Sequence, residues 1–362
     1  MALSWGQSKN QMVRASNGRR FFVGFAFAIQ IAGFSTAAVA QTSGYALGQG
    51  LNVGAFNVAG YATVEATARE DERAALLIED LSLFISGAVN KAINPFIEAE
   101  LAEADLWIEG QPPLTNVNPR IDLERIYNDF IVDEHLTLRV GKMLSPVGEW
   151  NSIHAGPLVW TTTRPLTTYL NYPEFISGIS AITDGLLDDR LRIEAYWQPA
   201  GDIDGPNPAT AVHLFRDTFG IHVRWALGLN DKIGLSVQQS DVRGTGERQR
   251  LVGLNGRVTV GSLEVESELT WTSLTAAAVP LRHRNEYAGY LQGSFELADR
   301  WYLVSRGEFF KGRDFDGTSR NFLIGINYRP NSPIAWKLEY VKQSGRNLGI
   351  SSGLIASFNI LF

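Results

Sequence analysis

The sequence predicts an all-β protein: a transmembrane antiparallel β-barrel of about sixteen strands, with a long third extracellular loop folded into the lumen. Segments with apolar residues at every second position recur along the chain, which is typical of sheets with two different faces. Short and long connections alternate between these segments, and the chain ends in an aromatic residue. Three segments alternate less cleanly, which leaves the strand count open by two.

The beginning of the chain has the pattern of an export signal. Residues 1–40 contain four bases and no acid, with an apolar run at residues 21–34 before Ala38-Val39-Ala40. This order predicts a signal peptide cleaved before Gln41. Gln30 interrupts the run, which is shorter than the roughly 20 apolar residues of a membrane-spanning helix. We therefore divide the chain into a signal peptide (1–40), a short periplasmic lead-in (41–55) and the barrel (56–362).

Composition excludes several other functions. Without the signal peptide the chain has 28 basic and 38 acidic residues, a net charge near −10, so nothing suggests nucleic-acid binding. It has no cysteine, which excludes a disulfide framework or a thiol nucleophile. Its five histidines show no ligand spacing, so we expect no metal and no cofactor. Ser152 and His154 lie two apart in a loop without an element to fix them, so we expect no enzyme.

The strands are predicted from the alternation of apolar and polar residues. Between residues 263 and 271, apolar and polar positions alternate, with Leu263, Val265, Leu269 and Trp271 on one face and Glu264, Glu266, Glu268 and Thr270 on the other. Taking strands as alternately up and down, outward aromatics fall into two belts, as expected beside membrane lipid. One belt contains Phe295, Trp225, Trp301, Tyr328 and Trp336, and the other contains Trp197, Trp271, Tyr287 and Phe322.

The connections separate into two classes. After the second strand, the short connections include residues 132–135, 229–231, 261 and 298–300, and the long ones include residues 108–120, 143–175, 199–216 and 273–283. A soluble β-sandwich has no reason to sort its loops in this way. Short turns on one rim and long loops on the other are typical of an outer-membrane barrel with both termini in the periplasm.

The last segment has Leu354, Ala356, Phe358, Ile360 and Phe362 on one face. It resembles the closing strand of bacterial outer-membrane proteins, whose terminal phenylalanine is read by the barrel-assembly machinery. The resemblance implies that Phe362 is an assembly signal and that this machinery is a partner.

The connection at residues 143–175 is far longer than ordinary loops of about 4–6 residues. It contains Trp150, Trp160, Tyr169 and Tyr172, which argues against a disordered segment. We expect it to fold into the barrel and narrow the pore.

Residues at the start of this loop carry a family resemblance. Arg139-Val-Gly-Lys142, followed by Pro146-x-Gly148 and Trp150-Asn151, is similar to a stretch in trimeric porins, notably the phosphate-selective porin family. The resemblance implies a homotrimer in which the third extracellular loop folds inward and basic side chains line an anion path. Here that loop has one base and two acids, so phosphate selectivity is not expected.

The candidate pore-lining residues are Arg139, Glu149, Arg164, Glu174, Glu98, Glu100, Glu264, Glu266 and Glu268. We expect Arg139 to pair with Glu149 or Glu174. Acids outnumber bases on the faces that point inward, which predicts a mild preference for cations. A second interpretation is that the mixed charges only keep the lumen hydrated. Salt screens the interaction of these charges with ions beyond about 8 Å at physiological ionic strength.

The sequence thus predicts an outer-membrane porin through which small hydrophilic solutes or ions diffuse passively. One alternative is a substrate-specific channel for a small organic acid, a sugar or phosphate. Another is a non-conducting barrel that serves as a structural or adhesive surface protein.

Overall fold

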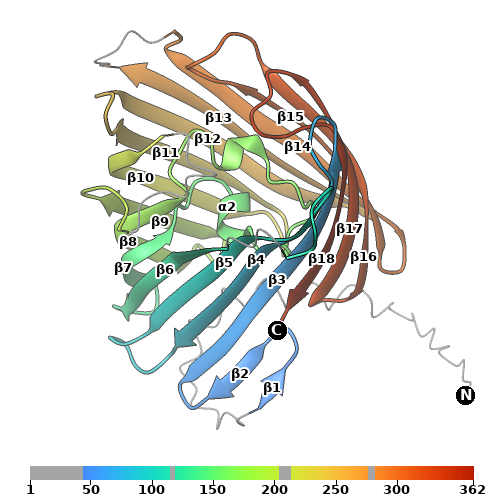
Figure 1. Ribbon diagram of the computed structural model, residues 1–362. Coiled ribbons are helices and arrows are strands. Elements are labelled where there is room, and N and C mark those ends of the chain that lie inside the picture. Colours follow the sequence, from blue (N-terminus) through green and yellow to red (C-terminus); the bar gives the residue numbers. More distant parts are fainter. Residues whose placement is uncertain (1–43, 115–118, 204–212, 276–281) are drawn as a thin grey trace, which may run out of the picture.

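A computed structural model describes residues 44–114, 119–203, 213–275 and 282–362. Within these residues, sixteen long strands form one closed antiparallel sheet, in which β18 pairs with β3 to complete the ring (Figure 1). Their bounds are β3 (Phe56–Arg69), β4 (Ala75–Gly87), β5 (Pro95–Ile108), β6 (Arg120–Ile131), β7 (Leu136–Leu144), β8 (Phe175–Leu186), β9 (Leu191–Gln198), β10 (Phe215–Ala226), β11 (Lys232–Val242), β12 (Arg248–Val260), β13 (Leu263–Thr275), β14 (Asn285–Ala298), β15 (Trp301–Lys311), β16 (Ser319–Asn331), β17 (Ile334–Gly345) and β18 (Gly353–Leu361). The predicted barrel of about sixteen strands is confirmed. The predicted signal peptide lies outside the described residues.

The strands are apolar outside and polar inside. On β16, the side chains of Phe322, Ile324 and Ile326 are exposed, whereas Asn321 and Asn327 at either end of this segment are buried. Because side chains alternate between the two faces of a strand, the apolar residues form the outer wall of the ring. Such an inverted distribution is expected of a barrel surrounded by lipid.

The two rims differ as the sequence predicts. At one rim the strands are joined by short turns, such as residues 261–262 and 299–300. At the other rim longer connections occur, among them residues 109–119 and 145–174. No helix within the described ranges is long and apolar enough to cross a membrane.

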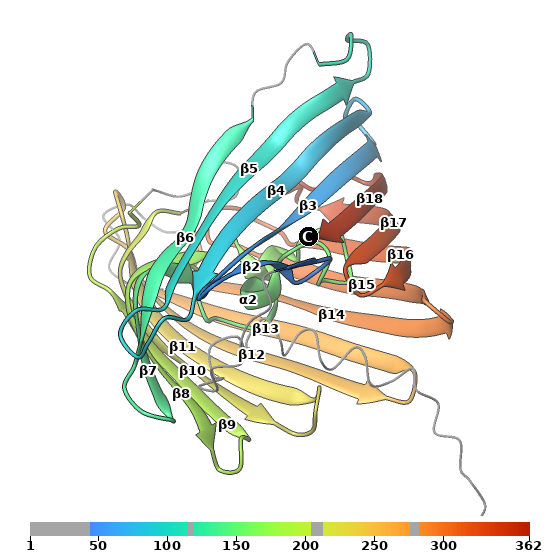
Figure 2. The same ribbon diagram turned by 90° about the horizontal axis from the view of Figure 1, so that it is seen from below.

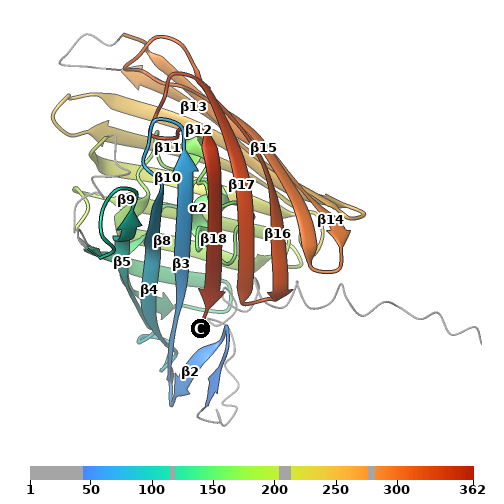
Figure 3. The same ribbon diagram turned by 45° about the vertical axis from the view of Figure 1, so that its right-hand side comes forward.

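The lead-in contains two short strands that the sequence analysis did not predict. β1 (Tyr45–Ala46) and β2 (Gly50–Val53) form a hairpin, and β2 pairs with the start of β3. Figures 1 and 3 show this hairpin below the ring, on the side where the C-terminus lies.

The closing seam is completed by the last residue. The backbone N–H of Phe362 donates to the Gly60 carbonyl at 2.8 Å, and the Gly60 N–H donates to the Phe362 carbonyl at 2.9 Å. A Cβ atom at residue 60 would lie 2.7 Å from the Phe362 ring, so glycine makes room for it. The terminal aromatic is therefore fitted to the first long strand of the barrel.

One strand edge is only partly paired. β6 pairs with β7 from Ile126 to Ile131, and within the described residues its segment 120–125 has no ladder partner on that side. Figure 2 shows β6 diverging from β7 beyond their paired segment. Ile121, in the unpaired segment, is 76% exposed. The ladder between β6 and β7 is therefore incomplete along residues 120–125 of β6.

Candidate functional site

The connection between β7 and β8 lies inside the ring of strands (Figures 1 and 2). It contains one helical turn, α2 (Trp150–Ile153), and one 3₁₀ turn, η2 (Leu166–Thr168). Such a connection has few hydrogen bonds of its own, and its buried backbone groups must find partners elsewhere. Most of those partners are charged side chains that point inward from β13 to β17.

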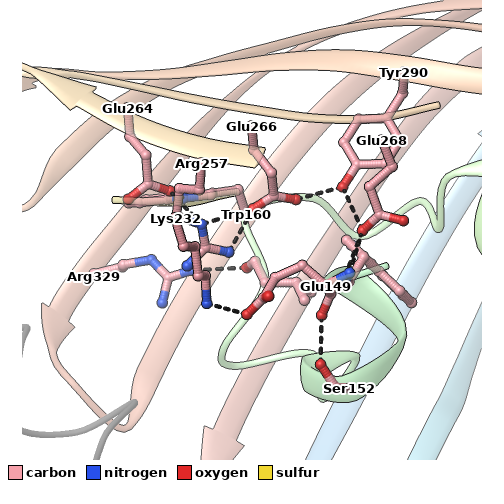
Figure 4. Close-up of polar contacts among 12 residues, drawn as sticks. Glu149, Ser152, Trp160, Lys232, Arg257, Glu264, Glu266, Glu268, Tyr290 and Arg329 are labelled. Atoms are coloured by element: carbon pink, nitrogen blue, oxygen red, sulfur yellow. Dashed lines mark hydrogen bonds and ion pairs between the residues drawn. The ribbon is translucent and has the colours of Figure 1, made fainter. Parts of the chain in front are cut away.

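The first turn of the loop is held by Glu268. Its carboxylate accepts the backbone N–H groups of Glu149 at 2.8 Å and of Trp150 at 2.7 Å (Figure 4). Tyr290 donates its hydroxyl to Glu266 at 2.6 Å and to Glu268 at 3.3 Å. Charge-assisted hydrogen bonds of this kind are about twice as strong as neutral ones. Glu268 therefore fixes the position of α2 against β13.

Glu149 itself is an ion-pair partner rather than a free acid. Its carboxylate pairs with Lys232 of β11 (Figure 4). Burial acts to raise the pKa of Glu149, but Lys232, Arg224 and Arg257 together lower it to about 2. The side chain is therefore charged at neutral pH and ties the loop to the β10–β12 wall.

Three further glutamates bind the middle of the loop. Glu339 accepts the N–H groups of Thr162 and Thr163, and Glu308 accepts that of Leu166 at 2.9 Å. Glu264 accepts the indole N–H of Trp160 at 2.7 Å (Figure 4). These carboxylates are used to position the loop.

Basic side chains bind the carbonyl groups of the same segment. Arg329 donates to the carbonyls of Pro157 and Val159 at 2.7 and 2.8 Å, and Lys337 donates to that of Gly156 at 2.7 Å. Arg306 donates to the Thr163 carbonyl at 2.8 Å and to the hydroxyl of Thr161 at 2.6 Å. The inner wall from β13 to β17 thus supplies both donors and acceptors for the backbone of the loop.

The tip of the loop is packed by apolar contacts. Leu166 and Leu170 are buried in a cluster that also contains Ala288, Phe310, Leu323, Val341, Ile350 and Ile355. These residues belong to β14–β18 and to the connection before β18. The apolar cluster packs the loop against β14–β18.

Open space remains on the other side of the loop. A cavity of about 850 Å³ lies between the loop and the inner wall of β3–β6. Side chains of the loop, including Trp150, His154 and Arg164, border it. Its acidic lining residues are Glu65, Glu72, Glu79, Asp80, Glu100, Glu103, Asp122, Glu124 and Glu174.

The predicted pore residues fall into different groups. Glu100 and Glu174 line the open cavity, together with Arg164. Glu264, Glu266 and Glu268 lie on the opposite wall. Glu264 and Glu268 bind the loop, and Glu266 accepts the hydroxyl of Tyr290. Glu98, also predicted to line the pore, is fully buried and paired with Arg125.

The predicted partner of Arg139 is wrong. Its guanidinium binds both carboxylate oxygens of Asp129, at 2.7 and 2.8 Å, on the neighbouring strand β6. Glu149 pairs instead with Lys232, and Glu174 pairs with Arg164 inside the loop. Asp129 is a cross-strand neighbour of Arg139, and the bidentate pair satisfies the guanidinium without an acid from the loop.

Several acids of the cavity were missed by the sequence analysis, among them Glu79 and Glu124. Glu79 and Glu124 each occupy the extra position of a β-bulge, where the register of β4 with β3 and of β6 with β5 shifts. A bulge places two residues opposite one and interrupts the alternation of faces. A strict period of two therefore cannot place these residues on the inner face. The change of phase within each strand was the only available signal.

His154 connects the loop to this acidic wall. Its Nε2 atom lies 3.6 Å from a carboxylate oxygen of Glu124. Burial acts to lower the pKa of His154, but the contact with Glu124 raises it above its ordinary value. The neighbouring Ser152 donates its hydroxyl to the Glu149 carbonyl at 2.8 Å (Figure 4), whereas the Nδ1 atom of His154 lies 3.0 Å from the Asn151 carbonyl. In the described part of the chain, no three His, Asp or Glu residues converge on a possible metal position.

A sixteen-stranded antiparallel barrel with a long loop bound to its inner wall defines the porin type of fold. Solved structures agree with this assignment. OmpF of Salmonella typhi, in a complex with daunomycin, matches with a TM-score of 0.64 and 12% identity, over 85% of this chain and 97% of that chain. An anion-selective porin from Comamonas acidovorans matches with a TM-score of 0.62 and 13% identity, over 85% and 99% of the two chains.

OmpT, an outer membrane protein of Vibrio cholerae in a trimer form, matches with a TM-score of 0.60 and 11% identity, over 85% of this chain and 99% of that chain. No protein-family model matches the sequence, and no curated protein is significantly similar to it. At these identities the likeness establishes the fold, which is that of outer-membrane porins.

Proposed function

We propose that this chain is an outer-membrane porin through which small hydrophilic solutes and ions diffuse passively. The observation that carries the proposal is the open cavity beside a loop that is fixed to the opposite wall. Sixteen strands enclose a lumen wide enough for water, and a loop that fills only part of it leaves a narrowed aqueous path. That path runs between the loop and β3–β6.

The same cavity supports a mild preference for cations. Its basic residues are fewer than its acids and mostly have acidic partners: Arg69 pairs with Glu65, Arg120 with Asp122, Lys142 with Asp202 and Arg164 with Glu174. Glu79, Asp80 and Glu100 have no base within 4.0 Å in the described part of the chain. Carboxylates without paired bases attract cations into a narrow aqueous passage.

We further propose a homotrimer in the bacterial outer membrane. The apolar outer wall and the sorted rims support the location. The unpaired upper edge of β6 supports assembly, because strand edges in membranes are normally paired or covered. A trimer of identical subunits would offer surface to cover that seam.

Single-channel recording of the purified protein in a planar lipid bilayer tests the function. We expect stepwise conductance in potassium chloride, and reversal potentials in a salt gradient that show potassium permeating better than chloride. A correctly folded barrel that gives no conductance would contradict the proposal and favour a surface protein. Conductance that one sugar or organic acid blocks in a saturable way would favour a substrate-specific channel.

Phe362 is proposed as the assembly signal. Deleting it removes both backbone hydrogen bonds to Gly60 and the ring that packs there. We expect export to continue while the yield of folded, heat-modifiable barrel falls severalfold. Phe362→Tyr keeps an aromatic end and serves as the matched control. An unchanged yield after deletion would show that the terminal ring only packs against the wall.

A further inference from the structure

A second hollow lies on the outer face of the barrel. It has a volume of about 900 Å³ and extends over β13–β17, of which β14–β17 are visible side by side in Figure 3. Five large side chains in its lining are exposed on the outer wall: Leu269, Tyr287, Leu291, Phe309 and Phe322. We call this feature the outer groove.

The outer groove exists because the outward position at Gly307, opposite Leu291 and Phe322, has no side chain. The neighbouring Gly289, opposite Phe309, is covered by Leu269, whose Cδ2 atom lies 2.4 Å from where a Cβ would be. A Cβ atom at Gly307 would meet no heavy atom within 4 Å, so the space above it is empty. Bulky neighbours around a missing side chain produce a slot rather than a smooth apolar wall. The slot has the shape for an extended hydrocarbon chain.

Three bases mark one end of the outer groove. Lys311, Arg320 and Lys342 are exposed, line it and lie on the adjacent strands β15, β16 and β17. Arg320 pairs in register with Phe309 and Ser344, so Lys311 and Lys342 are its diagonal neighbours. Diagonal neighbours across a sheet are about 7–8 Å apart, within reach of long side chains. The three cationic groups can therefore reach one anionic group.

These bases are largely uncompensated. Lys342 lies 3.6 Å from Glu70, and both side chains are well exposed. Lys311 and Arg320 have no acid within 4.0 Å in the described part of the chain. All three are at the rim of the long loops, next to Tyr287 and Phe322. Aromatic residues of this kind mark the level of lipid headgroups.

We propose that the outer groove binds a phosphorylated lipid of the outer leaflet. One acyl chain lies in the slot over Gly307, and a phosphate group meets Lys311, Arg320 and Lys342. Apolar burial stabilises the chain, and charge-assisted hydrogen bonds hold the phosphate. The inference rests on the proposed location in the outer membrane, because it assigns the long-loop rim to the outer leaflet.

Native mass spectrometry of the full-length mature protein in a mild detergent tests this inference. The probe is lipid A, a bisphosphorylated glycolipid, and phosphatidylethanolamine is the comparison lipid without net charge. We expect the unaltered protein to retain lipid A in preference to phosphatidylethanolamine. Lys311→Gln with Arg320→Gln should weaken lipid A binding roughly tenfold or more, since each base near a membrane surface contributes measurably. Arg250→Gln, an exposed base on β12 at the same rim, should have little effect.

Substitutions that fill the slot provide a second, independent test. Gly307→Leu places a side chain in empty space and should displace the acyl chain, lowering lipid A binding severalfold. Gly293→Leu is the matched control, because Gly293 lies on β14 outside the groove and a Cβ atom there meets only Leu263 at 3.6 Å. Heat-modifiability of each variant on gels verifies folding before lipid is added.

The outcomes separate the two proposals. Equal binding of both lipids, or no change in the charge variants, would overturn the lipid site while leaving conductance intact. Loss of oligomers in Gly307→Leu, with lipid binding unchanged, would assign the groove to a second copy of the chain instead. Channel recordings of the same preparation in phosphatidylethanolamine bilayers test the porin function separately, without lipid A.

Discussion

The two inner walls of the barrel use the same residue types for different purposes. On β13–β17, Glu268, Glu308 and Glu339 accept backbone N–H groups of the loop. On β3–β6, Glu79, Asp80 and Glu100 face open space and have no base within ion-pairing distance in the described residues. An inward glutamate is therefore not in itself a pore residue. Its contacts decide whether it binds the loop or lines the cavity, and in the proposed porin only the second group acts on passing ions.

The difference has a simple physical origin. A loop inside a barrel has lost the water that would hydrate its N–H and C=O groups, and each group left unsatisfied costs about 1–3 kcal/mol. The wall beneath the loop must supply partners of both signs. The wall across the cavity borders open space, and its acids do not bind the backbone of the loop. Under the proposed function, these acids set the ion selectivity.

Removing the loop should abolish the distinction between the two walls. Deleting residues 153–172 and joining the ends with a short Gly-Ser link opens the space in front of β13–β17. We expect single-channel conductance to rise roughly twofold or more, and larger sugars to enter, because lumen width then depends on the sixteen strands alone. Folding should be nearly unchanged, since no strand is altered. Unchanged conductance and size limit would place the constriction elsewhere.

Neutralising acids on each wall compares them directly. Asp80→Asn with Glu100→Gln should lower the potassium-to-chloride permeability ratio roughly twofold at low salt, where charges are least screened. Glu268→Gln keeps an oxygen that accepts the same N–H groups, so it should leave the ratio almost unchanged. Reversal potentials measured in the same gradient decide the matter. An equal effect of the two substitutions would contradict the division of roles.

Weakening the attachment of the loop should alter noise more than selectivity. Glu339→Ala removes the acceptor of the Thr162 and Thr163 N–H groups. We expect the loop to fluctuate, which appears as increased open-channel noise and conductance substates. Glu296→Ala, an exposed acid on β14, is the control and should leave recordings unchanged. A quiet Glu339→Ala channel would mean that the apolar cluster alone holds the loop.

The smallest expected effect is a dependence on pH. The pKa of His154 is raised in the folded protein, although burial opposes the rise, because Glu124 favours the charged form. The stabilisation from this pair is therefore fully present below about pH 6.5 and is lost as pH rises through the folded-state pKa. Open-channel noise should increase from pH 6 to pH 9, and His154→Gln should remove most of the change. Identical pH profiles would exclude His154 as the cause.

Alternation was sufficient wherever the strands are regular. The outward residues of β13 and β16 and the position of the long loop were all predicted from a period of two and from loop lengths. The same rule failed at Glu79 and Glu124, where a bulge shifts the phase of the strand. A second expectation, that Arg139 pairs with an acid of the loop, also failed, because its partner is a cross-strand neighbour on β6. Both failures concern local register, which depends on pairing with a neighbouring strand.

The sequence by itself determined the barrel, its rims and the existence of a long aromatic loop, because these follow from periodicity and spacing along the chain. Only the tertiary structure decided which wall the loop lies against. That choice depends on contacts between residues far apart in sequence, such as Trp160 with Glu264 and Leu166 with Glu308. Inward acids on both walls look alike in a sequence. They differ only once the loop has bound one set and left the other lining the cavity.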